Sequence, residues 1–354
     1  MQMSNREIGS TFYELTSTDV EFELLSKSKR DVSKLSLNYF YTGRNAFVAV
    51  MNDIMSRQKY NSIWLPKYYC DTVIKLFQNN YNNIRFYDID PFSFNVEIDV
   101  IAFASPNDIV ILNNFWGLSS FKDYNDILLP IIIEDHSHGW LSKASLNSKA
   151  DYCICSLRKT LPIPLGAIAW CTNRNFIPKY DELEVEIDQS YQYFETSFRL
   201  KREFLQSNLK SKEDFLELSS KAENLLNLSK KVSKPKDSHI TLWKKYLEFD
   251  TNIIKKRNLD YMQRSLEITN KFKVVKRNDY IPFGLLLAFK NESNFNSLKK
   301  WLISHSTYPA HLWPGMKNSG EWKFLLNIHI DFRYNIEDMC YLVEKINKWI
   351  KNDV

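Results

Sequence analysis

The chain has 354 residues, of which 44% are hydrophobic and 25% are charged, an ordinary globular composition with enough chain for a large core and two domains. The net charge of +5 is scattered, and the lysine-rich stretch 201–236 is interleaved with acidic residues, which argues against a nucleic-acid-binding protein. Five cysteines form no C-x-x-C pair, and no apolar stretch is long enough for a signal peptide or a membrane span, so we expect a soluble, cytoplasmic protein that binds no membrane.

Helices and strands alternate through the first half of the sequence. One helix is expected to begin at 41–44 and to end near residue 57, and a second covers 71–78. The expected strands lie at 62–66, 83–87, 108–113, 129–134, 152–156 and 166–171. This alternation predicts an α/β fold in which a mostly parallel sheet is flanked by helices on both faces.

The pattern changes in the second half. Residues 180–231 are helical and highly charged, and the stretch KKVSKPKDS at 230–238 has the composition of a hinge or an exposed turn. Beyond it we expect a smaller α+β unit, in which Asn335 caps the last helix with Asp338 in its first turn. Its expected strands are 281–289 and 324–329, and its expected helices are 294–304 and 336–350. We therefore predict a large N-terminal domain, 1–235, and a small C-terminal domain, 236–354.

The segment 131–167 contains the groups from which a function can be argued. The apolar run 131–134 is typical of a buried parallel strand, and Asp135 follows it at the carboxyl end, where open α/β sheets bind ligands. A second apolar run leads to Ser156 and then to Lys159. Pyridoxal phosphate requires such a set, because its aldehyde needs a lysine, its ring nitrogen a carboxylate and its phosphate hydroxyl and amide donors.

Structural interpretations of these residues remain open. A lysine at a strand end is most commonly structural, whereas the functional interpretation makes Lys159 the Schiff-base lysine. Asp135 is either a cap or strand terminator, or the carboxylate that keeps a pyridine nitrogen protonated. His136 and His138 next to Asp135 also fit a metal site, but no further His or Cys pair at familiar spacing supplies the other ligands, so no metal is expected.

Two segments nearer the N-terminus supply candidate phosphate and ring contacts. Thr42, Gly43 and Arg44 begin a helix, where free amides bind phosphate, although Thr-Gly is also a common helix cap. Tyr68 and Tyr69 follow a strand and are either core aromatics or the side chains that stack on a flat ring. Neither a Walker motif nor a G-x-G-x-x-G motif occurs, so nucleotide hydrolysis and dinucleotide binding are not supported.

Two residues near the C-terminus are weaker candidates for substrate binding. Arg333 lies between the last strand and the last helix, where it is either a salt-bridge partner or the group that grips a substrate carboxylate or phosphate. His311 lies in the aromatic-rich stretch 308–314, which is a candidate substrate-side loop.

Taken in order, these segments resemble a fold-type I pyridoxal-phosphate enzyme over most of the chain. The residues 40–44 resemble the helix start that holds the cofactor phosphate, and 64–69 resemble the strand and loop of the ring-stacking aromatic. Asp135 and His138 match a D-x-x-[QH] motif, and Ser156 and Lys159 match an S-x-x-K motif. The resemblance implies a seven-stranded sheet, Asp135 on the ring nitrogen, His138 near the 3-hydroxyl, and Ser156 on the phosphate.

Within that superfamily the chain most resembles the DegT-type sugar aminotransferases, although their lysine usually lies further beyond the serine. The resemblance implies a homodimeric enzyme that moves an amino group from an amino acid, such as glutamate, to a keto-sugar, which in many of these enzymes is nucleotide-linked. Such reactions belong to surface-polysaccharide or secondary-metabolite biosynthesis. Two alternatives stay open, a pyridoxal-phosphate lyase or decarboxylase acting on amino acids, and a non-catalytic binding protein with the same fold.

Overall fold

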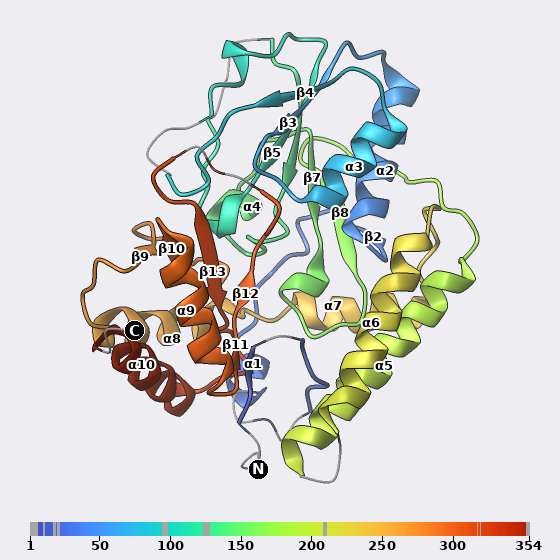
Figure 1. The fold of residues 1–354 in the computed structure, drawn as a ribbon. Coiled ribbons are helices and arrows are strands. Elements are labelled where there is room, and N and C mark those ends of the chain that lie inside the picture. The colour runs from blue at the N-terminus through green and yellow to red at the C-terminus, as the bar shows by residue number, and fades with distance from the viewer. Residues whose placement is uncertain are drawn as a thin grey trace.

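The computed structural model describes residues 6–351 apart from 10, 17–18, 20–21, 94–97, 123–127, 208–210, 317 and 319. Its centre is a seven-stranded sheet in the order β2-β8-β7-β6-β5-β3-β4 (Figure 1). The strands are β2 (Asn38–Phe40), β3 (Ile63–Pro66), β4 (Ile84–Tyr87), β5 (Ile109–Asn113), β6 (Ile131–Asp135), β7 (Tyr152–Cys155) and β8 (Ala167–Cys171). β3 to β7 pair in parallel, and β8 runs antiparallel to β7 and β2. The predicted α/β class and the mostly parallel seven-stranded sheet are confirmed.

Both faces of this sheet are buried, which explains why its strands are apolar throughout rather than alternating. On one face, side chains such as Ile111 and Ile133 pack against α2 (Gly43–Arg57) and α3 (Asp71–Asn80). On the other face, side chains such as Ile132 and Trp170 belong to a cluster that includes residues of the later helices. These later helices are α5 (Val185–Gln206), α6 (Lys212–Leu228) and α7 (Asp237–Leu247).

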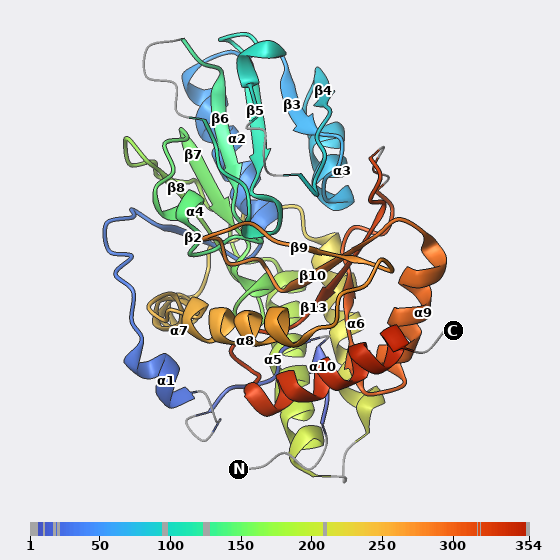
Figure 2. The ribbon, with the colours of Figure 1, turned by 90° about the vertical axis from the view of Figure 1, so that its left-hand side faces the viewer.

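The C-terminal part forms a second, smaller sheet. Its four strands are ordered β12-β13-β10-β9 and pair antiparallel, and α8, α9 and α10 pack on one face of the sheet (Figure 2). The elements are α8 (Asn252–Ser265), β9 (Lys273–Val275), β10 (Leu285–Phe289), α9 (Glu292–Ile303), β12 (Ala310–His311), β13 (Phe324–Ile328) and α10 (Ile336–Lys351). The predicted cap of α10 is confirmed, because the side chain of Asn335 accepts from the amide of Asp338 at 3.0 Å and the carboxylate of Asp338 accepts in return.

The N-terminal segment packs on the C-terminal unit, a connection that the sequence did not predict. β1 (Ile8–Gly9) pairs in parallel with β11 (Thr307–Tyr308). The remaining short elements are α1 (Phe22–Lys27), α4 (Lys143–Leu146) and the 3-10 turns η1 (Val100–Ala102), η2 (Phe115–Gly117) and η3 (Leu157–Lys159). No helix in the described ranges is both long and apolar enough to cross a bilayer.

The boundary between the two units is a matter of packing. Trp243 and Leu247 of α7 belong to the core cluster of the large sheet, whereas Leu259 and Met262 of α8 belong to the core of the small one. The boundary at residue 235 stays a prediction, and the packing of α7 favours one that falls within α8.

Candidate functional site

The candidate site lies at the carboxyl ends of β5, β6 and β7. Asn113, Asp135 and Ser156 end or follow these three strands, and Asn113 is directly opposite Asp135 in the register of β5 and β6. Because side chains alternate along a strand, Asp135 lies on the same face as Ile133, the face that α2 covers, and Glu134 lies on the other. We call Asp135, His138, Ser156 and Lys159 the strand-end cluster.

The carboxylate of Asp135 is buried and held by two donors. The backbone amide of Ser137 donates to Oδ1 at 2.9 Å, and the phenol of Tyr69 donates to Oδ2 at 2.5 Å. Burial, followed by the charge of Asp135, raises the pKa of Tyr69 well above its usual value, so the phenol keeps its proton and acts as the donor. The structure thus pairs one of the two predicted ring-stacking tyrosines with the predicted ring-nitrogen carboxylate.

His138 is buried among aromatic rings from three separate segments. Its ring stacks on Trp116 with centroids 5.3 Å apart, and it also contacts Phe283 at 4.7 Å and Trp313 at 5.3 Å. Burial, followed by the charge of Lys159, lowers the pKa of His138 well below its usual value, so the ring is neutral. Nδ1 of His138 is buried and has no hydrogen-bond partner among the described residues.

Lys159 ends the short turn η3 and is partly buried. In the described ranges, no residue lies within hydrogen-bonding or ion-pairing distance of its Nζ, although it is close enough to His138 and Cys155 to affect both pKa values. The amino group of Lys159 is therefore available for a ligand.

The start of α2 faces Ser156 at short range. Thr42 caps the helix by accepting from the amide of Asn45 at 3.0 Å, and the first amides of the helix have no intrahelical partner. A Cβ atom on Gly43 would lie 3.3 Å from Cβ of Ser156, so glycine permits this close approach. The backbone amide of Ser156 donates to Oγ of Ser137 at 2.9 Å. This arrangement of amides and hydroxyls suits an anion.

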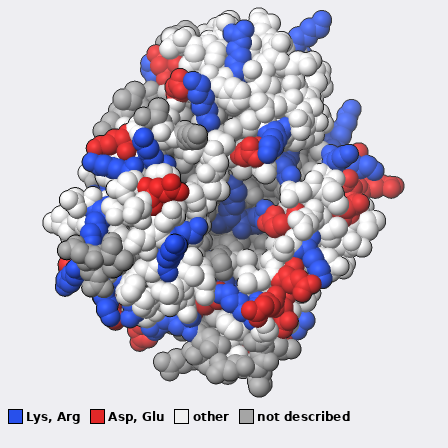
Figure 3. Space-filling model, in the orientation of Figure 1, with Lys and Arg blue, Asp and Glu red and all other residues white. Residues whose placement is uncertain are grey.

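Two arginines flank this helix start and are anchored to α6. Arg44 donates to the carbonyl oxygen of Leu226 at 3.0 Å, and Arg158 pairs with Glu223 at 2.7 Å. Burial, followed by repulsion from Arg158, lowers the pKa of Arg44, so the two positive charges lie near one another. Figure 3 shows Lys and Arg atoms at the bottom of a hollow near the middle of the molecular face.

Tyr68, the other predicted stacking residue, lies in an aromatic cluster. Its ring contacts Phe92, Phe115, Trp116 and Trp313 at centroid distances of 5.6 to 6.4 Å. Among the described residues its hydroxyl forms no hydrogen bond with the strand-end cluster, in contrast with that of Tyr69. Stacking of either tyrosine on a ligand ring stays a prediction.

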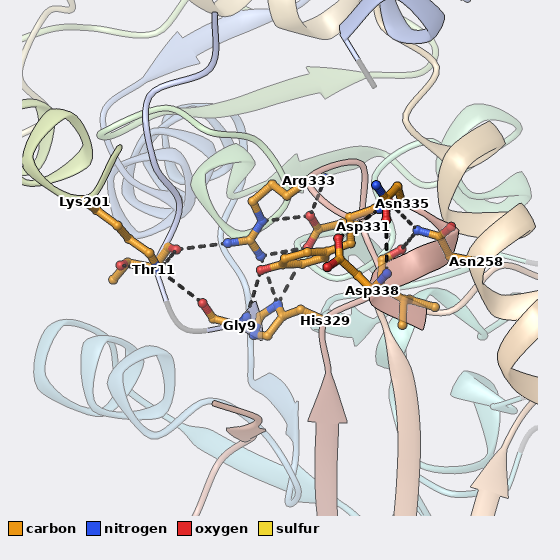
Figure 4. A network of polar contacts seen from close by, with 11 residues as sticks. Gly9, Thr11, Lys201, Asn258, His329, Asp331, Arg333, Asn335 and Asp338 are labelled. Carbon is orange, nitrogen blue, oxygen red and sulfur yellow. Dashed lines mark hydrogen bonds and ion pairs between the residues drawn. The ribbon is translucent and has the colours of Figure 1, made fainter. Parts of the chain in front are cut away.

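The guanidinium group of Arg333 is paired with other residues of the protein. Nε and Nη2 of Arg333 bind the two oxygens of Asp331 at 2.8 Å each, and Nη1 donates to the carbonyl of Thr11 at 2.9 Å. Figure 4 shows this group, which we call the C-terminal cluster: His329, Asp331 and Arg333. Burial would raise the pKa of Asp331, but the Arg333 guanidinium outweighs it and holds that pKa far below its usual range. The salt-bridge interpretation of Arg333 is therefore the one that the structure favours.

His311 packs within the C-terminal unit rather than against the strand-end cluster. It lies on β12, and its ring packs against Phe295 of α9 at 4.6 Å. Burial, with the nearby charge of Lys299, lowers its pKa. Nothing in these contacts supports the predicted substrate role.

Sequence reasoning missed two contributors to the site. Trp313 reaches both predicted cofactor residues from the C-terminal unit, since its ring lies 5.8 Å from that of Tyr69 as well as beside His138. Asn113 is buried, and its Nδ2 has no partner among the described residues. A polar residue ending the apolar run of β5 was the available signal for Asn113, whereas no local signal marks Trp313.

Glu134, His136 and Cys153 form a buried group on the opposite face, with their ligand atoms within 4.8 Å of one another. Nε2 of His136 lies 2.9 Å from Glu134, and Nδ1 lies 3.1 Å from Nδ2 of Asn114. An amide NH₂ can only donate, so Nδ1 accepts and Nε2 carries the proton toward Glu134. This tautomer satisfies His136 without a metal ion.

Neither the models of known protein families nor the curated protein sequences gave a match to this chain. Solved structures did match over almost its whole length. Spr1654 of Streptococcus pneumoniae, assigned as a sugar aminotransferase and solved in its PMP form, has a TM-score of 0.57 at 11% identity and covers 98% of each chain. The E. coli GDP-4-keto-6-deoxy-D-mannose-3-dehydratase, with hydrated PLP, has a TM-score of 0.56 at 12% identity over 96% of this chain and 100% of its own.

A DegT DnrJ EryC1 StrS aminotransferase from Brucella abortus matches with a TM-score of 0.52 at 13% identity, over 93% of this chain and 88% of its own. The chain has the fold of the fold-type I pyridoxal-phosphate enzymes. The resemblance stated from the motifs is therefore confirmed at the level of the fold. At identities this low, chemistry has to be argued from the site.

Proposed function

We propose that the chain is a pyridoxal-phosphate-dependent aminotransferase that uses the strand-end cluster to hold its cofactor. The observation that carries this proposal is that, among the described residues, Nζ of Lys159 is unpaired and Nδ1 of the neutral His138 nearby has no hydrogen-bond partner. Buried polar atoms without partners are rare in folded proteins, and a bound group that pairs with them removes their energetic cost. The residues present therefore fit this cofactor.

Each end of the cofactor has matching residues. Asp135 would hold the ring nitrogen, Lys159 the aldehyde carbon and His138 the 3-oxygen. Ser156, Thr42, Gly43 and Arg44 would hold the phosphate through their hydroxyls, amides and guanidinium. When bound, pyridoxal phosphate supplies an electron sink for a carbanion at the substrate carbon.

Lys159 is the proposed acid and base of the reaction. Its Nζ can accept and donate a proton, whereas burial keeps His138 neutral and both oxygens of Asp135 already accept hydrogen bonds. Repulsion between Lys159 and any proton on His138 also keeps that histidine uncharged. The aromatic rings around His138 exclude water from this side of the cluster.

We further propose that the amino donor is glutamate and that the acceptor is a keto-sugar, nucleotide-linked, in surface-polysaccharide or secondary-metabolite biosynthesis. The support is the fold shared with a sugar aminotransferase and a keto-sugar dehydratase. A cytoplasmic homodimer, in which a partner subunit completes the site, belongs to the same proposal.

The main rival is a lyase or decarboxylase that acts on amino acids. Such an enzyme needs an anchor for the α-carboxylate of its amino-acid substrate, and Arg333 was its candidate. All three guanidinium nitrogens of Arg333 are engaged by Asp331 and Thr11, so this rival loses its anchor.

The test is to follow each half-reaction separately by stopped-flow absorbance. Glutamate should change the spectrum of the loaded enzyme, and a nucleotide keto-sugar from a broad panel should reverse the change. Lys159→Ala should abolish both changes, and Lys179→Ala, which alters an exposed lysine, should leave both intact. If only 2-keto acids reverse the change, the sugar assignment is wrong.

A further inference from the structure

Tyr69 and Tyr68 are adjacent in sequence and both buried, yet only the phenol of Tyr69 reaches Asp135. The distance between the phenol oxygen and Oδ2 is 2.5 Å, at the short end for a hydrogen bond to a carboxylate. We propose that Tyr69 is a positioning residue. It orients Asp135 and lowers the affinity of the Asp135 carboxylate for the proton that would lie between it and the cofactor ring nitrogen. This inference rests on the proposed function and adds a residue that sets how firmly the ring proton is held.

The geometry limits what Tyr69 can do. Its ring is fully buried and lies edge-on to Trp313, with centroids 5.8 Å apart and planes at 89°. Burial raises the pKa of the phenol well above its usual value, so the hydroxyl donates over the whole working pH range. The phenol of Tyr69 donates to Oδ2 and the amide of Ser137 donates to Oδ1. Each carboxylate oxygen of Asp135 therefore accepts one hydrogen bond before any ligand binds.

These two bonds have a chemical consequence. A carboxylate that already accepts hydrogen bonds is a weaker base, because the bonds stabilise its charged form. A weaker base at Asp135 competes less for the proton that would lie between it and the ring nitrogen, so that proton would stay on the ring nitrogen. Removal of the phenol would make Asp135 a stronger base and would draw that proton toward its own oxygen.

The test compares wild type with Tyr69→Phe and with the matched control Tyr68→Phe, each loaded with ¹⁵N-labelled pyridoxal phosphate. In Tyr69→Phe, the ¹⁵N chemical shift of the ring nitrogen below the titration midpoint should move toward the unprotonated value. The pH at which the pair of ring nitrogen and Asp135 loses its proton should rise by about one unit, a tenfold change in the proton affinity of the pair. Tyr68→Phe should match wild type in both. Identical shifts and midpoints in wild type and Tyr69→Phe would overturn the proposal.

Two further measurements separate this inference from its premises. In the Asp135→Asn background, Tyr69→Phe should have no additional effect on the ¹⁵N shift, because Tyr69 acts through the carboxylate. An undiminished effect in that background would show that Tyr69 acts on the ring directly. Borohydride reduction followed by mass analysis checks loading: failure to label Lys159 in wild type would contradict the proposed function, whereas labelling without a Tyr69 effect would contradict this inference alone.

Discussion

Two clusters of this molecule contain the same kinds of side chain and differ in how they are paired. The strand-end cluster combines an aspartate, a histidine and a lysine, and the C-terminal cluster combines Asp331, His329 and Arg333 (Figure 4). In the second, the cation is fully paired, and Nε2 of His329 is the buried atom left without a partner in the described ranges. In the first, Nζ of Lys159 and Nδ1 of His138 have no partner in the part of the chain that the structure describes. The comparison teaches that pairing, more than residue type, separates a binding site from a structural link.

Sequence position gives a reason for the difference. The C-terminal cluster joins the N-terminal segment to the loop before α10, and the bond from Arg333 to Thr11 spans 322 residues. Lys201 of α5 donates to the same carbonyl of Thr11 at 2.8 Å. This cluster therefore joins three distant segments, whereas the strand-end cluster lies at the edge of a sheet that is already held by its own ladder.

The largest expected effect separates the two clusters by activity. Lys159→Ala should lower the rate of amino transfer by about a hundredfold to ten-thousandfold, because it removes the acid and base of the reaction. Its free energy of unfolding should change by no more than about 0.5 kcal/mol, because Nζ of Lys159 loses no partner among the residues that the structure describes. Chemical denaturation and the two half-reactions measure these quantities. A large loss of stability would mean that Lys159 is structural.

The reverse pattern is expected for the C-terminal cluster. Arg333→Ala should lower the free energy of unfolding by about 3–5 kcal/mol, because it leaves the buried charge of Asp331 without its partner. Arg57→Ala, which removes an exposed helical pair with Asp53, is the control and should cost less than about 1 kcal/mol. If Arg333→Ala keeps wild-type stability but loses its response to the amino donor, Arg333 is a substrate anchor after all.

A pH dependence of stability should come from Lys201 in the same network. Burial, opposed by the charge of Glu7, lowers the pKa of Lys201 to about 8 from 10.5. Between these values the unfolded chain binds more protons than the folded one, so the free energy of unfolding should rise with pH across that window, by roughly 1–3 kcal/mol. Lys201→Met should flatten the rise in denaturation curves taken from pH 7 to pH 10.5. An equal rise in both proteins would assign it to other groups.

The smallest expected effect concerns His138. His138→Phe keeps a flat ring between Trp116 and Phe283 and removes the buried, unpaired Nδ1, so the unloaded protein should become more stable by about 1 kcal/mol. The loaded variant should show a shifted pH titration of its cofactor absorption band. Lower stability together with an unchanged titration would indicate that His138 only packs.

The fold and the order of the motifs were predictable from local sequence patterns, whereas the contacts between distant side chains were not. Isoleucine runs ending in Asp135, and an Asn335 cap with Asp338 three residues later, are read directly from the sequence and are present in the structure. Strand β2 and helix α8 were not predicted. The edge strand β2 is only three residues long, and the many charged residues of α8 obscure its apolar stripe in the sequence. The hydrogen bond between Tyr69 and Asp135 and the packing of Trp313 on His138 join segments that are far apart in the chain. The local periodicity of the sequence therefore cannot predict them.

The most direct test of the account is to map where pyridoxal phosphate attaches. The protein should be loaded with the cofactor, reduced with borohydride, digested and analysed by mass spectrometry. We predict that the cofactor is fixed on the peptide that contains Lys159 and that Asp135→Asn weakens the loading. Fixation on Lys201 or on any other lysine, or none at all in wild type, would contradict the assignment of the strand-end cluster as the cofactor site.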